Sequence, residues 1–179
     1  MARIAVITHA CDNFLTENYL LRSFVGVWAE QGHRVTLCRG AGRWPDADLA
    51  ILHVDLSVVP TAYAQAQQRY AKVINGAALD IRKRKVSSQL LNRTDEWRGA
   101  VIVKTDLNCN GLNEARVRRA LEAAGAPVDE TLISATSMNG DYPIFPSMDD
   151  VPSKVWNDPG LVVERYFPQR DEEIGRAHV

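Results

Sequence analysis

Lys104 stands at the end of an apolar, β-type run, and the segment after it has the composition of an anion-binding loop. The run covers residues 99–103, the polar stretch Asp-Leu-Asn-Cys-Asn-Gly covers 106–111, and a helical pattern follows over 112–124. A lysine at the end of a buried strand costs free energy unless an anion meets it, and loop N–H groups beside it favour a phosphate. We therefore predict a strand, a phosphate loop and a helix. The loop matches neither G-x-x-x-x-G-K-[ST] nor G-x-G-x-x-G.

Two more charged residues lie beside predicted elements. Lys85 closes the basic cluster 82–85, and two lysines that converge on one phosphate chain would share its charge as point donors. Glu164 ends an apolar strand before Arg-Tyr-Phe-Pro, where an acceptor with free backbone beyond it could bind the edge of adenine. The alternatives are a solvated Lys85, a Lys104 ammonium that reaches solvent along its stem, and a solvent-facing Glu164.

Composition restricts the class of protein. The chain has 179 residues, 46% of them hydrophobic, with 21 basic and 22 acidic residues and a net charge of −1. This is a globular composition, without the charge that attracts nucleic acid or an anionic membrane. Its three cysteines are widely spaced, which favours a reducing compartment. No apolar stretch approaches the roughly 18 residues of a membrane helix, and Met-Ala-Arg leads directly into a strand, so we expect no targeting segment and a cytoplasmic protein.

The first part of the chain has a β-α-β rhythm. Predicted strands cover 3–9, 34–38, 49–54 and 73–75, and predicted helices cover 16–31 and 60–70. In the first helix we expect Thr16 as N-cap, Gly32 as the stop, and one apolar face made of Leu20, Phe24, Val27 and Trp28. Short connections of this kind predict a parallel sheet with right-handed crossovers. Residues 1–78 are therefore expected to form a small α/β domain.

The second part, residues 79–172, is expected to be a separate α+β lobe. Its predicted elements are helices at 87–91, 112–124 and 151–156 and strands at 100–104, 142–145 and 161–164. Strands 3–8 and 100–104 should accordingly lie in different sheets. Residues 173–179, Glu-Ile-Gly-Arg-Ala-His-Val, match a translated sequencing adapter. We interpret them as an artefact, which implies that the gene was cut near Glu172.

The order of these features resembles the ATP-grasp superfamily. The β-α-β unit is followed by a strand with Asn75, Lys-x-x-Ser from Lys85, Val-Ile-Val-Lys ending at Lys104, and Val-Val-Glu-Arg-Tyr-Phe-Pro over 162–168. The resemblance covers residues 3–172, as a pre-ATP-grasp domain and a first ATP-grasp subdomain truncated at its C-terminus. It implies that Lys104 and Lys85 contact the phosphates of ATP, and that the loop with Asn110 and Gly111 closes over them.

The same resemblance implies an adenine site. Glu164 would face the adenine amino group, the backbone from Arg165 to Phe167 would complete the adenine edge, and Asp171 would hold the ribose. Thr105 stands where the family often has proline, and the loop is poor in glycine. In this family the Mg²⁺ carboxylates belong to the second subdomain, beyond residue 172. We therefore predict no metal ligands and no ligase activity for the 179-residue chain itself.

The implied activity is that of an ATP- and Mg²⁺-dependent ligase. Such an enzyme joins a small carboxylate, here unknown, to an amine or thiol through an acyl phosphate. Residues 29–37, Ala-Glu-Gln-Gly-His-Arg-Val-Thr-Leu, are also similar to the first β-α-β unit of sugar-nucleotide glycosyltransferases, although that class explains neither Lys104 nor Glu164. A third interpretation is a non-catalytic nucleotide-binding module. The identity of the nucleotide that binds would distinguish these three interpretations.

Overall fold

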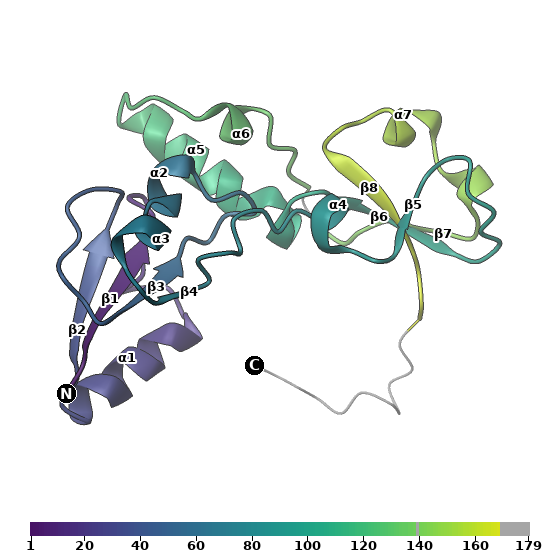
Figure 1. Ribbon diagram of the computed structural model, residues 1–179. Helices are drawn as coiled ribbons and strands as arrows, with labels where there is room; N and C mark the ends of the chain where they lie inside the picture. The colour runs from purple at the N-terminus through teal and green to yellow at the C-terminus, as the bar shows by residue number, and fades with distance from the viewer. Residues whose placement is uncertain (139, 169–179) are drawn as a thin grey trace.

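The computed structural model describes residues 1–138 and 140–168, and its strands form two separate four-stranded sheets (Figure 1). The first sheet is parallel, in the order β2-β1-β3-β4, and the second is antiparallel, in the order β5-β8-β6-β7. The strands are β1 (Arg3–Thr8), β2 (Arg34–Arg39), β3 (Leu49–His53), β4 (Val73–Ile74), β5 (Leu90–Leu91), β6 (Val101–Thr105), β7 (Ile144–Phe145) and β8 (Leu161–Arg165). The predicted mixed α/β class with a parallel first sheet is confirmed, and β1 and β6 lie in different sheets as expected. The domain boundary at residue 78 stays a prediction, and residues 173–179 lie outside the described part.

The first sheet has apolar cores on both faces. Ile4 and Val6 of β1 pack toward α1 (Leu20–Glu30), whereas Ala5 and Ile7 pack toward α2 (Thr61–Ala64) and α3 (Ala66–Arg69). Because helices cover both faces, the strand must be apolar at every position. This explains why β1 is a continuous apolar run. The helix predicted over 60–70 is divided into α2 and α3.

Helix α1 differs from the prediction in its start and in its buried face. It begins at Leu20, and the Thr16 hydroxyl donates to the Asn13 carbonyl instead of capping it. The stripe toward the sheet is Leu21, Val25 and Trp28, while Leu20, Phe24 and Val27 are exposed by 56%, 47% and 47%. Both stripes have helical spacing, so periodicity alone could not choose between them. The predicted stop is confirmed, since Gly32 has a φ of 82° and follows the last turn.

One face of the second sheet carries its apolar core. Val101, Val103 and Val163 form its core with Leu91 and Met148, under α7 (Ser153–Trp156) and the short η2 (Met148–Asp150). The helix predicted at 87–91 is wrong: α4 covers Lys83–Val86, and Leu90–Leu91 form β5 against β8. Burial of Leu91 in this core is a tertiary contact that a short local pattern does not report.

Helix α5 (Leu112–Ala123) follows β6 as predicted, and its apolar contacts reach the first part of the chain. Its Val117 and Leu121 pack with Leu56 and with Leu132 of α6 (Glu130–Ile133), a helix that was not predicted. In Figure 1, α5 accordingly extends from the region of α4 toward α2. Among the described residues, no helix has the length and apolar character needed to cross a membrane.

Candidate functional site

The face of the second sheet opposite its apolar core carries Lys104 and Glu164. Antiparallel pairing sets Lys104 opposite Val162 and Ile102 opposite Glu164, so all four side chains lie on one face. Lys104 Nζ is 2.7 Å from Glu164 Oε2. The Lys104 side chain is 27% exposed and that of Glu164 is 7% exposed. The anion that meets Lys104 is therefore a carboxylate from the neighbouring strand.

Glu164 is held in its ionised form. Burial by itself would raise the pKa of this carboxyl, but hydrogen bonds from Lys104 and Ser87 and the nearby charge of Lys83 outweigh burial and lower the pKa. A buried carboxylate is stable only with such partners. At neutral pH the site thus contains one buried negative charge and two lysine ammonium groups.

Lys83, which was not predicted as a site residue, lies beside Lys104. Its Nζ donates to the Leu107 carbonyl and is 5.6 Å from the ring centre of Tyr142, and Lys104 Nζ is 5.9 Å from the same ring. Both distances are within the range of cation–π attraction. Tyr142 therefore forms a common wall for the two ammonium groups.

Lys85 is on the same turn as Lys83 but is exposed. Its positive charge acts on Asp80, whose pKa is lowered first by the hydrogen bond from Arg82 and further by Lys85. The structure thus brings Lys83, rather than Lys85, to Lys104. The spacing of Lys83 and Ser87 by four residues, one helical turn, would have indicated this if the helix had been predicted at 83–86.

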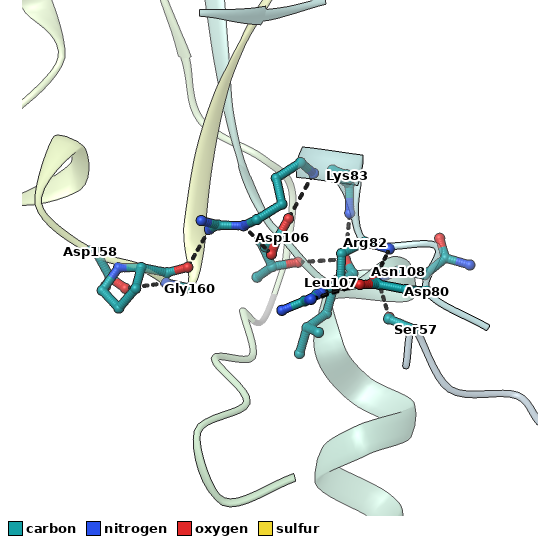
Figure 2. A network of polar contacts seen from close by, with 12 residues as sticks. Ser57, Asp80, Arg82, Lys83, Asp106, Leu107, Asn108, Asp158 and Gly160 are labelled. Atoms are coloured by element: carbon teal, nitrogen blue, oxygen red, sulfur yellow. Dashed lines mark hydrogen bonds and ion pairs between the residues drawn. The ribbon is translucent and has the colours of Figure 1, made fainter. Parts of the chain in front are cut away.

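Hydrogen bonds to other segments hold the first half of the predicted phosphate loop. Asp106 accepts hydrogen bonds from the backbone N–H groups of Lys83 and Arg84 and from the Arg84 side chain, at 2.8, 2.8 and 2.5 Å. Figure 2 shows Asp106 next to Lys83. The Asn108 N–H donates to Ser57 Oγ at 2.7 Å. The N–H of Asp106 bonds to the Gly160 carbonyl. Two of the loop donors that could have met a phosphate are therefore used within the protein.

The rest of the loop has an unusual backbone. Cys109, Asn110 and Gly111 have φ values of 45°, 56° and 70° within η1 (Asn108–Gly111) and its junction with α5. Glycine is required at the last position for a second reason, because a Cβ there would lie 2.5 Å from the Thr136 carbonyl oxygen. The Asn110 side chain donates to the Gly140 carbonyl at 3.1 Å. Asn110 and Gly111 thus shape the loop.

The residues predicted for the adenine edge lie where β8 ends. The backbone N–H groups of Arg165 and Tyr166 donate to Gln89 and Ala100 at 2.9 Å, so both are used in the sheet. The Arg165 guanidinium is 5.2 Å from the Trp97 ring centre, and the ring of Phe167, itself 57% exposed, is 5.8 Å from that of Trp97. Asp171 lies outside the described residues.

A magnesium site is not formed by the residues present. Within 1–138 and 140–168, no three His, Cys, Asp or Glu side chains come together in a way that could hold a metal ion. Asp106, the carboxylate of the loop itself, is already paired with Arg84. The described residues therefore do not fit Mg²⁺.

No protein-family model matches this chain, and neither a curated protein nor a solved structure is detectably similar to it. Function is therefore inferred from the site geometry and from the order of the motifs.

Proposed function

We propose that this chain is the ATP-binding part of an ATP-grasp ligase, with a pre-ATP-grasp domain and a first ATP-grasp subdomain. The observation that carries the proposal is the Lys104–Glu164 pair, at 2.7 Å on the face of the antiparallel sheet opposite its apolar core, with Lys83 beside it. The order of elements supports it too, since a parallel sheet precedes a strand, a polar loop and a helix.

The proposed chemistry is positioning and charge. Lys104 and Lys83 would donate to phosphate oxygens, because an ammonium is a compact point charge with three donors. Glu164 would then accept from the adenine amino group, so the nucleotide would replace both ends of the internal ion pair. Tyr142 and the apolar Ile102 and Val162 would face the nucleotide on the same side of the sheet. Bound Mg²⁺ would add counter-charge to the phosphates, from ligands outside the described residues.

The reaction and the compartment belong to the proposal through the family resemblance. The carboxylate oxygen of a small substrate attacks the γ-phosphorus and ADP leaves, after which an amine or thiol displaces phosphate from the acyl carbon. Preorganised cations are the main contribution of a protein to phosphoryl transfer. We propose a cytoplasmic enzyme. A sugar-nucleotide glycosyltransferase would need only the parallel β-α-β unit and would leave the Lys104–Glu164 pair without a role.

The test measures nucleotide binding to the 179-residue chain by calorimetry and by NMR of backbone amides. ATP should bind saturably, and UDP-glucose should not. Lys104→Met should weaken ATP binding by about 1.5–3 kcal/mol, the range for a hydrogen bond to a charged group. Lys154→Met is the matched control, because Lys154 is exposed on α7, and it should bind ATP as the unchanged chain does.

A second variant keeps the test independent of folding. Glu164→Gln retains the side-chain shape, and it should reduce the preference for ATP over GTP because the amide can also donate to a guanine oxygen. Thermal melts identify any variant that fails to fold. Equal affinity of the folded Lys104→Met chain and the Lys154→Met control for ATP, or tighter binding of UDP-glucose than of ATP, would refute the proposal.

A further inference from the structure

A cavity of about 210 Å³ lies in the first part of the chain, at the carboxyl ends of β1 and β2. Its wall includes Thr8 at the end of β1, Leu37 and Arg39 of β2, and Asp12 and Phe14 of the loop after β1. The crevice outside the carboxyl ends of parallel strands is where open α/β sheets bind ligands. None of these residues takes part in the nucleotide site proposed above.

Two polar groups in this wall are buried without a partner. Thr8 is 0% exposed and its Oγ1 has no hydrogen bond, and Asp12 is 4% exposed with an unpaired Oδ1. The other Asp12 oxygen accepts only a long hydrogen bond, 3.4 Å, from the Tyr19 hydroxyl. Buried polar atoms in folded proteins nearly always have a partner. Thr8 Oγ1 and Asp12 Oδ1 therefore each lack the donor that a buried oxygen normally has.

The environment of Asp12 favours a cationic donor. Burial raises the pKa of this carboxyl, while the charges of His53 and Arg116 act in the opposite direction and that of Asp55 adds to the rise. Among the described residues, Asp12 forms no ion pair. An ammonium group hydrogen-bonded to Asp12 would offset the cost of burying its charge.

Arg39 places a positive charge in the same wall of the cavity. Arg39 is exposed, its Nε donates to the Ala10 carbonyl at 2.7 Å, and in the described part of the chain it too has no ion-pair partner. Phe14, Leu15 and Leu37 give the wall apolar surface, and the polar Asn13 and Thr16 complete it. A buried negative group, an exposed positive group and apolar side chains therefore line one cavity.

The size of the cavity limits the ligand. Its volume of about 210 Å³ is several times the roughly 30 Å³ that one water occupies in the liquid. It is also below the roughly 300–1,000 Å³ of pockets for drug-sized ligands. A molecule with a few non-hydrogen atoms fits these limits, and a nucleotide does not.

We propose that this cavity binds a small aliphatic α-amino acid as its zwitterion. The ammonium group donates to the Asp12 carboxylate, the carboxylate pairs with the Arg39 guanidinium, and the side chain packs on Phe14 and Leu37. A simple amine leaves Arg39 without a partner, and a simple carboxylate meets the negative charge of Asp12. This site needs no nucleotide, so it stands apart from the function proposed above.

The experiment titrates the 179-residue chain, without ATP, with L-alanine, L-valine and L-leucine, and follows the backbone amides of Thr8 and Arg39 by NMR. For L-valine the matched probes are 2-methylpropylamine, which lacks the carboxylate, and 3-methylbutanoate, which lacks the ammonium group. We expect saturable shifts with at least one amino acid. Each matched probe should bind at least about tenfold more weakly, the loss expected for one charge-assisted contact.

Two variants locate the binding. Arg39→Gln should weaken amino-acid binding by at least about tenfold, as expected for one lost charged contact, and Arg34→Gln, at an exposed arginine on the same strand, should leave it unchanged. Asp12→Asn removes the buried charge with little change of shape, and it should abolish the advantage of the amino acid over 3-methylbutanoate. The proposal is overturned if no amino acid shifts the cavity amides, if the amine binds as tightly as the amino acid, or if both Arg39→Gln and Asp12→Asn bind normally.

Discussion

Replacing Lys104 by methionine should destabilise the second sheet by leaving the Glu164 carboxylate buried without its ammonium partner. Removing one member of a fully buried pair costs about 3–5 kcal/mol, while exposed pairs contribute about 0–1 kcal/mol. The Glu164 side chain is 7% exposed and that of Lys104 is 27% exposed, so solvent screens the pair in part. We expect Lys104→Met to lower the free energy of unfolding at pH 7 by about 2 kcal/mol, between these limits.

The effect should depend on pH in a defined direction. The folded-state pKa of Glu164 lies below its ordinary value of 4.5, so the pair stabilises the fold above that value. This stabilisation is lost as the pH falls from 4.5 through the folded-state pKa. In Lys104→Met, burial dominates and the pKa of Glu164 rises. The difference between the two chains should therefore be largest near neutral pH and should shrink once Glu164 is protonated in both.

Urea unfolding from pH 3 to pH 8 measures this difference, with tryptophan fluorescence as the signal, to which Trp97 and Trp156 of the second sheet's core contribute. Lys154→Met is again the control. The double variant Lys104→Met/Glu164→Leu should recover most of the lost stability, because no lone buried carboxylate remains. A loss below about 0.5 kcal/mol for Lys104→Met at pH 7, the size of an ordinary surface substitution, would refute this reasoning. An equal loss at pH 3 and pH 7 would do so too.

Three further predictions test other parts of the structure. Lys83→Met should weaken ATP binding nearly as much as Lys104→Met does, whereas Lys85→Met should change it little; calorimetry with ATP decides, and the opposite order would restore Lys85 as the second phosphate lysine. Gly111→Ala should lower stability by more than about 1 kcal/mol, because its φ is 70° and a Cβ would lie 2.5 Å from the Thr136 oxygen; a thermal melt within error of the unchanged chain would contradict this. Phe24→Ser should change stability by less than about 0.5 kcal/mol, since Phe24 is 47% exposed, and a large loss in urea unfolding would show that the predicted inner face was correct.

Much of the fold was predictable because its signals are local. Residues 4–7 are apolar at each position, as a strand covered on both faces must be, and β1 covers Arg3–Thr8. The pattern over 112–124 predicted α5, which covers Leu112–Ala123. Gly32 marked the end of α1 because glycine adopts the left-handed backbone conformation needed there at little cost in free energy.

The candidate site was predictable only as separate residues. Lys104 and Glu164 were each indicated by their places at strand ends, 60 residues apart in the chain. Their contact follows from the antiparallel register of β6 and β8, which sets Ile102 opposite Glu164. Lys83 was overlooked because Lys85 was chosen from the Lys-x-x-Ser match, whereas the fold turns Lys83 toward Tyr142 and leaves Lys85 exposed.

The sequence by itself determined where the main strands and the long helix α5 form, because hydrophobic periodicity and glycine stops act within a few residues. The tertiary structure alone decided which stripe of α1 is buried, that Leu90–Leu91 are a strand, and that the loop after Lys104 is tied to Ser57 and Arg84. It also decided that Asp12 and Arg39 share one cavity. Each of these depends on partners far along the chain, and the free energy of burying or pairing a side chain is set by those partners rather than by its neighbours in sequence.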